Sequence, residues 1–459
     1  MVDYIPLIMF AVVCIVLLFG YPVAFSLAGT ALMFAFGGTL FGVFDPSFLS
    51  AAPSRLYGLM INQTLLAVPL FVFMGCMLQQ SKLAENLLES MSAVMQRLRG
   101  GLGIAVAVVG MLLAASTGIV GATVVTMGLI SLPTMLRRGY DPAIATGTIC
   151  ATGTLGQIIP PSIALVLLGD VMSSAYSQAQ RNMGIFSPDT VSVGDLFIGA
   201  IFPGLMLVAL YILYIVAVAW LRPERMPRHR EEDNPEGKSY NLWRDLTPPL
   251  ILIVAVLGSI LAGIATPTEA AGVGAFGAAV LAALRGFLTI AILREVCRQT
   301  TRVTCMVFLI LVGASIFSLV FRGYGGDDLI QSIFTNMPGG STGAIIIVML
   351  VIFLLGFILD FIEITFVVVP IVGPVLLQMG FDPVWLGIMI ALNLQTSFLT
   401  PPFGFSLFYL RGVAPDSVST RQIYRGVIPF IAIQLLMLAI LALWPDLATW
   451  LPEQFFQPG

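Results

Sequence analysis

The sequence predicts an all-α integral membrane protein built from two inverted repeats, and three observations carry that prediction. Of the 459 residues, 58% are hydrophobic and only 10% are charged, and the mean hydropathy is +1.00. A water-soluble domain carries more charge than this, so lipid must surround most of the chain. Apolar runs recur along the whole length, and motifs of the first half return in the second half at a constant offset.

Ten apolar runs are long enough for a helix that crosses a bilayer. They lie near residues 4–20, 22–42, 56–79, 142–172, 196–220, 248–266, 268–284, 303–321, 383–410 and 427–449. Two further stretches, 101–138 and 342–379, are too long for one crossing and contain no charged loop. We expect each to form a re-entrant hairpin whose tip is buried in protein at mid-membrane depth. The alternative is a pair of ordinary spans joined by a tight turn.

The two halves share a spaced motif. Gly139-Tyr140-Asp141-Pro142 precedes Pro160-Pro161, and Gly380-Phe381-Asp382-Pro383 precedes Pro401-Pro402 at the same spacing, so the offset is 241 residues (380 − 139 and 401 − 160). The only long hydrophilic stretch lies between the halves. We therefore predict a first repeat over residues 1–221, a cytoplasmic linker over 222–247 and a second repeat over 248–459.

The distribution of cationic residues predicts the orientation. Each half contains five crossings and one hairpin, which is an odd number of crossings, so the halves must lie upside down relative to each other. With the N-terminus outside, 18 of the 21 Lys and Arg residues fall on the cytoplasmic side, leaving Arg55, Arg181 and Arg322 outside. This bias agrees with the positive-inside rule and predicts a multi-pass protein of the cell inner membrane.

Each repeat also contains a span that proline must interrupt. Asp141 and Asp382 each precede a proline that opens a helix, as expected of N-caps. The spans 142–172 and 383–410 then meet adjacent prolines, which cannot lie inside a continuous helix. Polar residues cluster at both breaks, and their hydroxyl and carbonyl oxygens are hard ligands that suit Na⁺. The alternative is a proline kink whose Ser and Thr side chains satisfy the local backbone.

Other functional classes find no support in the residues. The chain has no basic stripe for nucleic acid, no zinc helix, no nucleotide-binding glycine loop and no nucleophile elbow, and its five cysteines are scattered singly. We expect neither an enzyme nor a cofactor, and without an ATP site transport must draw on an ion gradient. Asp360 and Glu363 lie near the middle of the second hairpin stretch, where an ionisable group indicates function unless the tip rests near the outer interface.

These motifs resemble the large membrane subunit of tripartite ATP-independent periplasmic (TRAP) transporters, of the DctM type. The resemblance is carried by Thr154-Leu155-Gly156, by Ile159-Pro160-Pro161-Ser162, and by Asn393-Leu394 with Thr400-Pro401-Pro402-Phe403-Gly404, and it covers nearly the whole chain. It implies an inverted-repeat elevator-type transporter with two re-entrant hairpins and two broken helices. It also implies Na⁺-coupled uptake of a small organic acid, with a periplasmic substrate-binding protein and a small four-helix membrane subunit as partners.

The resemblance further implies two sodium sites, each between a hairpin tip and its neighbouring broken helix. Their residues by analogy are, for the first site, Ser116, Thr117, Gly153, Thr154, Gly156 and Pro160, and for the second, Asp360, Glu363, Asn393, Thr396, Ser397 and Thr400.

Two features depart from the family pattern. Many members have small apolar residues at the positions of Gln395 and Thr396. The polar stretch from Ser173 to Val193 is an external insertion, either a contact for the binding protein or a simple loop. A stand-alone ion/carboxylate symporter with related inverted repeats is the alternative function. A membrane-embedded lipid transferase would need an interfacial cluster of charges, and the acidic residues are too dispersed to form one.

Overall fold

The computed structural model describes residues 2–81, 83–95, 98–227, 242–335 and 337–456, and all regular secondary structure in these ranges is helical. Seven of the described helices are long and apolar enough to cross a membrane, or nine spans if each of two bent helix pairs counts as one. The chain is therefore a multi-pass, all-α membrane protein, as its composition predicts.

The helices of the first half run from the N-terminus to the linker. They are η1 (Val2–Tyr4), α1 (Ile5–Leu18), α2 (Val23–Leu40), η2 (Pro46–Ala51), α3 (Ala52–Ile61), η3 (Thr64–Leu66), α4 (Ala67–Gln80), α5 (Leu83–Met95), α6 (Gly101–Thr117), α7 (Val120–Arg137), α8 (Pro142–Thr154), η4 (Leu155–Gln157), α9 (Ile163–Asn182), α10 (Val193–Leu221) and η5 (Pro223–Arg225).

The described part of the second half contains eleven α-helices and no 3-10 helix. They are α11 (Leu242–Leu261), α12 (Pro267–Leu284), α13 (Ile290–Gly323), α14 (Gly326–Thr335), α15 (Gly340–Leu355), α16 (Phe361–Val367), α17 (Val369–Gln378), α18 (Pro383–Leu399), α19 (Phe405–Val413), α20 (Thr420–Leu443) and α21 (Asp446–Phe456).

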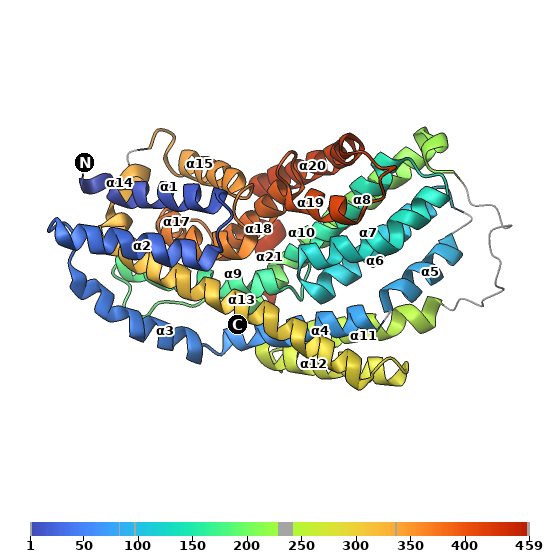
Figure 1. Ribbon diagram of the computed structural model, residues 1–459, viewed down its shortest axis with the longest axis horizontal. Coiled ribbons are helices and arrows are strands. Elements are labelled where there is room, and N and C mark those ends of the chain that lie inside the picture. Colours follow the sequence, from blue (N-terminus) through green and yellow to red (C-terminus); the bar gives the residue numbers. More distant parts are fainter. Residues whose placement is uncertain (1, 82, 96–97, 228–241, 336, 457–459) are drawn as a thin grey trace.

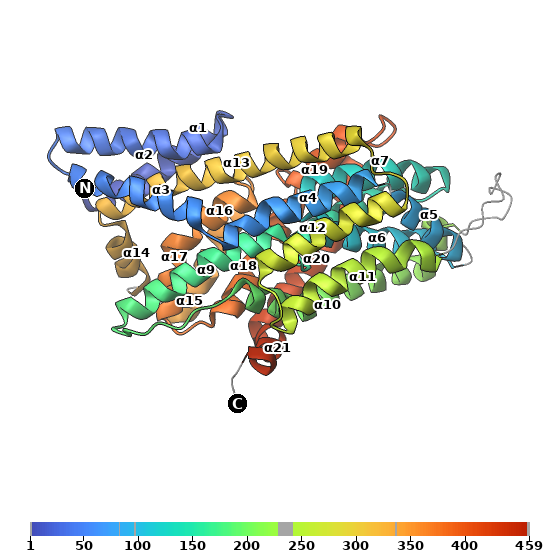
Figure 2. The ribbon, with the colours of Figure 1, turned by 90° about the horizontal axis from the view of Figure 1, so that it is seen from below.

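The packing of the outer helices displays the inverted repeat. Helices α2 and α12 both contain 18 residues and begin 244 residues apart (267 − 23). Helix α2 packs on α13, and α12 packs on α4, so each pair joins equivalent elements. In Figures 1 and 2, α1 and α2 lie towards one end of the molecule, and α11 and α12 lie towards the other. Sequence-related helices therefore occupy opposite ends.

Both predicted hairpins form between these outer helices. Helices α6 and α7 pack against each other and are joined only by Gly118 and Ile119, and Gly118 adopts a left-handed conformation (φ 61°) that suits glycine. In the second hairpin α15 leads to the tip at residues 356–360, and the returning arm is α16 and α17, bent by 57°. Measured by the 241-residue offset, α7 (120–137) corresponds to residues 361–378, the bounds of α16 and α17 together.

Several boundaries differ from the sequence predictions. The predicted span 56–79 is a helix pair bent by 53° around residues 62–63. Helix α11 begins at Leu242, inside the predicted linker 222–247, of which residues 228–241 lie outside the described part. Helix α13 extends over 34 residues, beyond the predicted 303–321 at both ends. The predicted span 427–449 ends at Leu443, and α21 follows as a separate helix.

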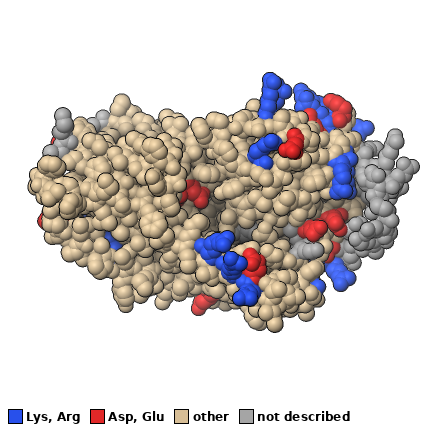
Figure 3. All heavy atoms as spheres, viewed as in Figure 1, with Lys and Arg blue, Asp and Glu red and all other residues tan. Residues whose placement is uncertain are grey.

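The surface charge is unevenly distributed. On the face shown in Figure 3, Lys and Arg side chains gather in the middle and in the right half of the molecule, the half in which Figure 1 shows α5, α7 and α11, while the opposite end is almost free of charge. Large apolar side chains such as Phe25, Phe36 and Leu284 are exposed on the outer helices. Exposed apolar side chains over such an area are expected only where lipid is the solvent.

Candidate functional site

Two interrupted helices cross the centre of the molecule. Helix α8 ends in the short turn η4, and the chain stays non-helical from Ile158 to Ser162 before α9 begins. Helix α18 ends at Leu399, and α19 begins at Phe405. Each break contains a cis proline pair, Pro160-Pro161 in the first and Pro401-Pro402 in the second. The breaks predicted from the adjacent prolines are therefore present in both repeats.

The predicted N-caps precede both interrupted helices. The Asp141 carboxylate accepts a hydrogen bond from the Ala143 amide at 2.8 Å, and the Asp382 carboxylate accepts one from the Trp385 amide at 2.8 Å. Each side chain satisfies an otherwise free N–H of the first helical turn. Both prolines then occupy the first helical position, where their missing N–H costs nothing. The two aspartates therefore have a structural role, because they cap the helices α8 and α18 that lead to the two breaks.

Serine side chains satisfy part of the backbone that the breaks release. Ser162 donates to the Gly156 carbonyl at 2.6 Å, and Ser406 donates to the Phe398 carbonyl at 2.8 Å. Both serines are fully buried, so these carbonyls would otherwise lack a donor at considerable cost. The alternative interpretation of the sequence was that polar side chains near the prolines only bond to the local backbone. That interpretation holds for one carbonyl in each break, the one that accepts from the serine.

The residues expected in the first sodium site point in two directions. A Cβ at Gly153 would collide with Val124 of α7, and a Cβ at Gly156 would lie 3.0 Å from the Ala114 carbonyl oxygen of α6, so both glycines admit the arms of the first hairpin. Thr154 instead faces α18 and α20. Its hydroxyl donates to the Ala151 carbonyl at 2.8 Å and accepts amide hydrogens from Gln395 at 3.2 Å and Gln434 at 3.5 Å.

Three further residues complete that expected set. Pro160 lies at an apolar crevice that α6, α10 and α11 border. The backbone of Ser116 and Thr117 ends α6 at the hairpin tip, and their side chains lie outside the described part of the structure. The first break and the first hairpin thus meet through Gly153 and Gly156.

The carboxylates of the second expected site belong to the hairpin tip itself. Asp360 caps α16 and accepts from the Phe361 amide at 2.6 Å, while Glu363 accepts from the Asp360 amide at 2.8 Å. The two side chains form a capping box, which orders the start of α16. Glu363 is buried. Gly356 and Leu359 of the tip are also buried, while Phe357, Ile358 and Asp360 are half-buried, so the protein encloses the tip only in part.

The remaining residues of this set lie on α18. Asn393 donates to the Met349 carbonyl of α15 at 2.7 Å, and Ser397 lies against Gly356, where a Cβ would collide with its Oγ. Asn393 and Ser397 therefore face the second hairpin from one side of α18. Thr396 donates to the Leu392 carbonyl at 2.8 Å, and Thr400 donates to the Thr396 carbonyl at 2.7 Å, so both hydroxyls bond to their own helix.

A cavity of about 100 Å³ separates the two hairpin tips. Its lining combines the first hairpin tip, the second hairpin tip, the first break, and side chains of α13 and α19. The lining residues that begin helices are Val120 and Gly121 of α7, Ile163 and Ala164 of α9, and Phe361 and Ile362 of α16. The N-terminal ends of three helices thus border one small cavity. The start of α16 is capped by the carboxylates of Asp360 and Glu363, and Asp360 itself lines the cavity, so only α7 and α9 present helix starts without a carboxylate cap to it.

Gln157 is the polar side chain that the first break contributes to this cavity. It is 2% exposed, and within the described part of the chain neither atom of its amide has a hydrogen-bond partner. An unpaired buried amide is costly and requires an explanation such as a ligand or water. Gln157 is not among the residues predicted from the sequence, although a polar residue between Gly156 and Pro160 was a usable signal.

Residues 9–447 match the family model described as "Tripartite ATP-independent periplasmic transporter, DctM component". The chain belongs to this family. It is 29% identical to the C4-dicarboxylate TRAP transporter large permease protein DctM of Vibrio cholerae, with 98% of each chain covered. It is 30% identical to the protein of the same description from Pseudomonas aeruginosa, over 90% of this chain and 91% of the relative.

Other relatives of this TRAP permease are named for substrates other than C4-dicarboxylates. The ectoine TRAP transporter large permease protein TeaC of Halomonas elongata is 28% identical, over 98% of this chain and 99% of the relative. The crystal structure of the Alcanivorax borkumensis YdaH transporter superposes with a TM-score of 0.61 at 14% identity, over 88% of this chain and 89% of that one. That likeness concerns the fold alone.

Membership in the family also settles the functional class of the chain. As the large permease component of a TRAP transporter, it is a transport protein and not an enzyme. The candidate transport site of this DctM-type permease therefore consists of the cavity between the hairpin tips, the two breaks and Gln157.

Proposed function

We propose that this chain translocates a small organic acid through the cavity between its two hairpin tips. The cavity supports this proposal because α7 and α9 begin at it and because Gln157 presents an unpaired amide to it. Helix starts and amide hydrogens stabilise a carboxylate, and Na⁺ at the second expected site would offset the charge of Asp360, which also lines the cavity. Relatives named for C4-dicarboxylates, ectoine and sialic acid support small polar solutes as the class.

We further propose that uptake is coupled to Na⁺ at the two expected sites. Asn393 and Ser397 support the second site, since both face the second hairpin beside its capped tip. Gly153 and Gly156 support the first, because they let hairpin backbone approach the first break. In the described residues no group of three or more His, Cys, Asp or Glu side chains converges, so neutral oxygens supply most ligands, which suits Na⁺.

The proposed mechanism is an elevator in the cell inner membrane. In this mechanism one body would move against a scaffold of α1–α5 and α11–α14. The moving body would comprise hairpins α6–α7 and α15–α17, the interrupted helices α8–α9 and α18–α19, and helices α10 and α20. The packing of α20 and α7 on α8 and of α17 on α9 supports a common body. The substrate would arrive from a periplasmic binding protein, and a separate small membrane subunit would brace the scaffold.

Uptake into proteoliposomes tests the coupling. The chain is reconstituted with its small membrane subunit and substrate-loaded binding protein, and an inward Na⁺ gradient is compared with an equal K⁺ gradient. We expect uptake only with Na⁺, and we expect Ser397→Ala to raise the Na⁺ concentration for half-maximal uptake. Undiminished uptake in K⁺ would refute Na⁺ coupling. Uptake by this chain alone would refute the proposed partners.

A further inference from the structure

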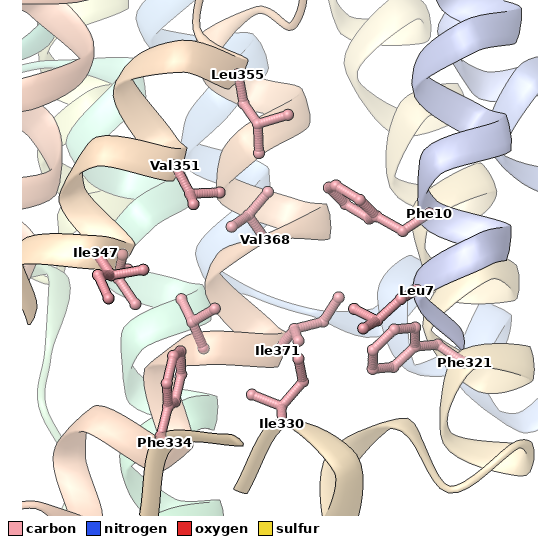
Figure 4. Close-up of a pocket in the computed structure, with 12 residues that line it drawn as sticks. Leu7, Phe10, Phe321, Ile330, Phe334, Ile347, Val351, Leu355, Val368 and Ile371 are labelled. Atoms are coloured by element: carbon pink, nitrogen blue, oxygen red, sulfur yellow. The ribbon is translucent and has the colours of Figure 1, made fainter. Parts of the chain in front are cut away.

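An apolar crevice lies beside the second hairpin. It has a volume of about 250 Å³ and separates α1, α13 and α14 from hairpin arms α15 and α17. In Figure 4, side chains of the hairpin arms and of α1 point into the gap from opposite sides. All residues that line it are apolar, among them Leu7, Phe10, Val351, Leu355, Val368 and Ile371.

A second apolar crevice lies beside the first hairpin. It has a volume of about 190 Å³ and separates α11 from α6 and α10. Leu250 and Ile253 of α11 line it, and they follow Leu7 and Phe10 of the first crevice by 243 residues in both cases (250 − 7 and 253 − 10). Each crevice therefore lies between the first helix of one repeat and the hairpin of the other. The two crevices thus share these two walls, whereas the remaining walls differ: α13 and α14 border the first, and α10 borders the second.

The size and lining of the crevices restrict what can occupy them. An apolar cavity of about 150 Å³ excludes water and binds a molecule such as benzene. A helix about 10 Å wide with a rise of 1.5 Å per residue takes roughly 120 Å³ per residue. The larger crevice therefore holds about two residues of helix, which excludes a helix of another subunit. A hydrocarbon chain fits.

The mouths of the crevices show where such a chain comes from. Val351 at the first crevice and Leu250 at the second are each 43% exposed. Next to them in sequence, Leu350 and Ile251 are 55% and 61% exposed, as on a helix that faces lipid. The lining is therefore continuous with the lipid-facing surface, and unfilled apolar walls forfeit dispersion contacts that a neighbouring acyl chain restores.

We propose that each crevice binds one acyl chain of a bilayer phospholipid. The chain enters beside Val351 or Leu250 and inserts between a hairpin and the helix that faces it from the other repeat. In the first crevice it reaches Val368 and Ile371, which are 4% and 8% exposed. The two lipids are thus part of the boundary between the hairpins and the surrounding helices, and their binding does not depend on the proposed transport mechanism.

Native mass spectrometry of the full chain tests this proposal with crevice-filling variants. Val351→Phe fills the first crevice and Leu250→Phe the second. Ile346→Phe and Ile251→Phe are controls on the same helices, because these side chains are exposed and line neither crevice. We expect each filling variant to retain one phospholipid fewer than the parent, the double variant two fewer, and the controls the same number. Equal retention in all variants would overturn the proposal.

Photo-crosslinking provides a second measurement. The probe is a phosphatidylcholine with a diazirine near the end of one acyl chain, and the adducts are located by peptide mass spectrometry. We expect adducts on Val368 and Ile371, which are too buried for lipid at the perimeter to reach. We also expect Val351→Phe to remove these adducts. Adducts on exposed α2 side chains should remain in the variant. Adducts confined to exposed side chains would overturn the proposal. So would cross-links to a second copy of this chain from a photoreactive side chain at position 351.

Discussion

Gln395 donates a hydrogen bond to the hydroxyl of Thr154 at 3.2 Å, and the two residues are 241 positions apart. This separation equals the offset between the two repeats, so the pair consists of equivalent residues. Residues related by a two-fold axis touch only where they lie close to that axis. The contact therefore marks the crossing point of the two interrupted helices, and Gln434, which donates to Thr154 at 3.5 Å and to Tyr211 at 2.9 Å, extends it into a polar cluster.

Thr154→Val should destabilise the protein through this cluster. The Thr154 O–H donates to Ala151, so its oxygen is the acceptor for the Gln395 amide, and removal leaves that buried donor unpaired. An unpaired buried group costs about 1–3 kcal/mol. Thermal unfolding in detergent, followed by tryptophan fluorescence, should show a lower Tm. The control is Thr148→Val, equally buried but bonded only to the Ile144 carbonyl of its own helix. Equal Tm losses in the two variants would contradict the argument.

Gly356→Ala should disrupt the seating of the second hairpin. A Cβ at this position would collide with Ser397, and relief of such overpacking costs about 1–3 kcal/mol. We expect a lower Tm, recovered largely when Ser397→Gly is added, because the second change removes the colliding atoms. Gly29→Ala in α2 is the control, since nothing lies within 4 Å of its Cβ position. A double variant no more stable than Gly356→Ala alone would refute the contact.

Gln157→Leu should weaken substrate binding without loss of stability. Its amide is unpaired in the described structure, so replacement by an apolar side chain of similar size removes a buried polar group at no cost to folding. If the amide binds the substrate carboxylate, loss of about 1.4 kcal/mol raises KM about tenfold. The control Gln180→Leu removes the acceptor of the Asp189 amide and should lower Tm with KM unchanged. An unchanged KM for Gln157→Leu would remove this residue from the site.

A cross-link between α9 and α14 should block transport if α9 moves. Gln178 of α9 bonds to Arg322 at 2.7 Å and to Asp327 at 3.3 Å. With the exposed Cys297 and Cys305 replaced by serine, a bifunctional maleimide that joins Gln178→Cys to Asp327→Cys should reduce uptake at least tenfold. Joining Arg322→Cys to Asp327→Cys is the control, since both lie in the proposed scaffold. Full uptake after the first cross-link would rule out movement of α9 against α14.

The repeat and its breaks could be predicted from the sequence because proline, glycine and aspartate act locally. Pro160 and Pro401 forbid a continuous helix in any surroundings, and Asp141 and Asp382 cap the helices that their own sequence begins. The directions of side chains could not be predicted in this way. Residues 153 and 154 are neighbours in sequence, yet one faces hairpin α6–α7 and the other faces α18, because successive residues of a helix point about 100° apart.

The short helices α5 and α14 were also not predicted from the sequence. Helices α5 and α14 contain 13 and 10 residues, too few to cross a bilayer, and carry polar residues that lower their mean hydropathy. Gln157 was missed because its lack of a partner is a property of the folded surroundings and not of its spacing. The hydroxyls of the expected ligand residues Thr396 and Thr400 donate to carbonyls of their own helix, which is a property of the folded structure.

Helix α9 contains 20 residues and its equivalent α19 contains nine, so the extension that carries Gln178 exists on one repeat only. Under the proposed elevator mechanism, the contacts of Gln178 with Arg322 and Asp327 would form in only one of the inward-facing and outward-facing conformers and would favour that conformer. Half-buried polar contacts of this kind are worth about 1 kcal/mol, which changes the ratio of the two conformers about fivefold. We therefore expect this permease to rest on one side of its cycle, and we expect shortening α9 to even out the dwell times.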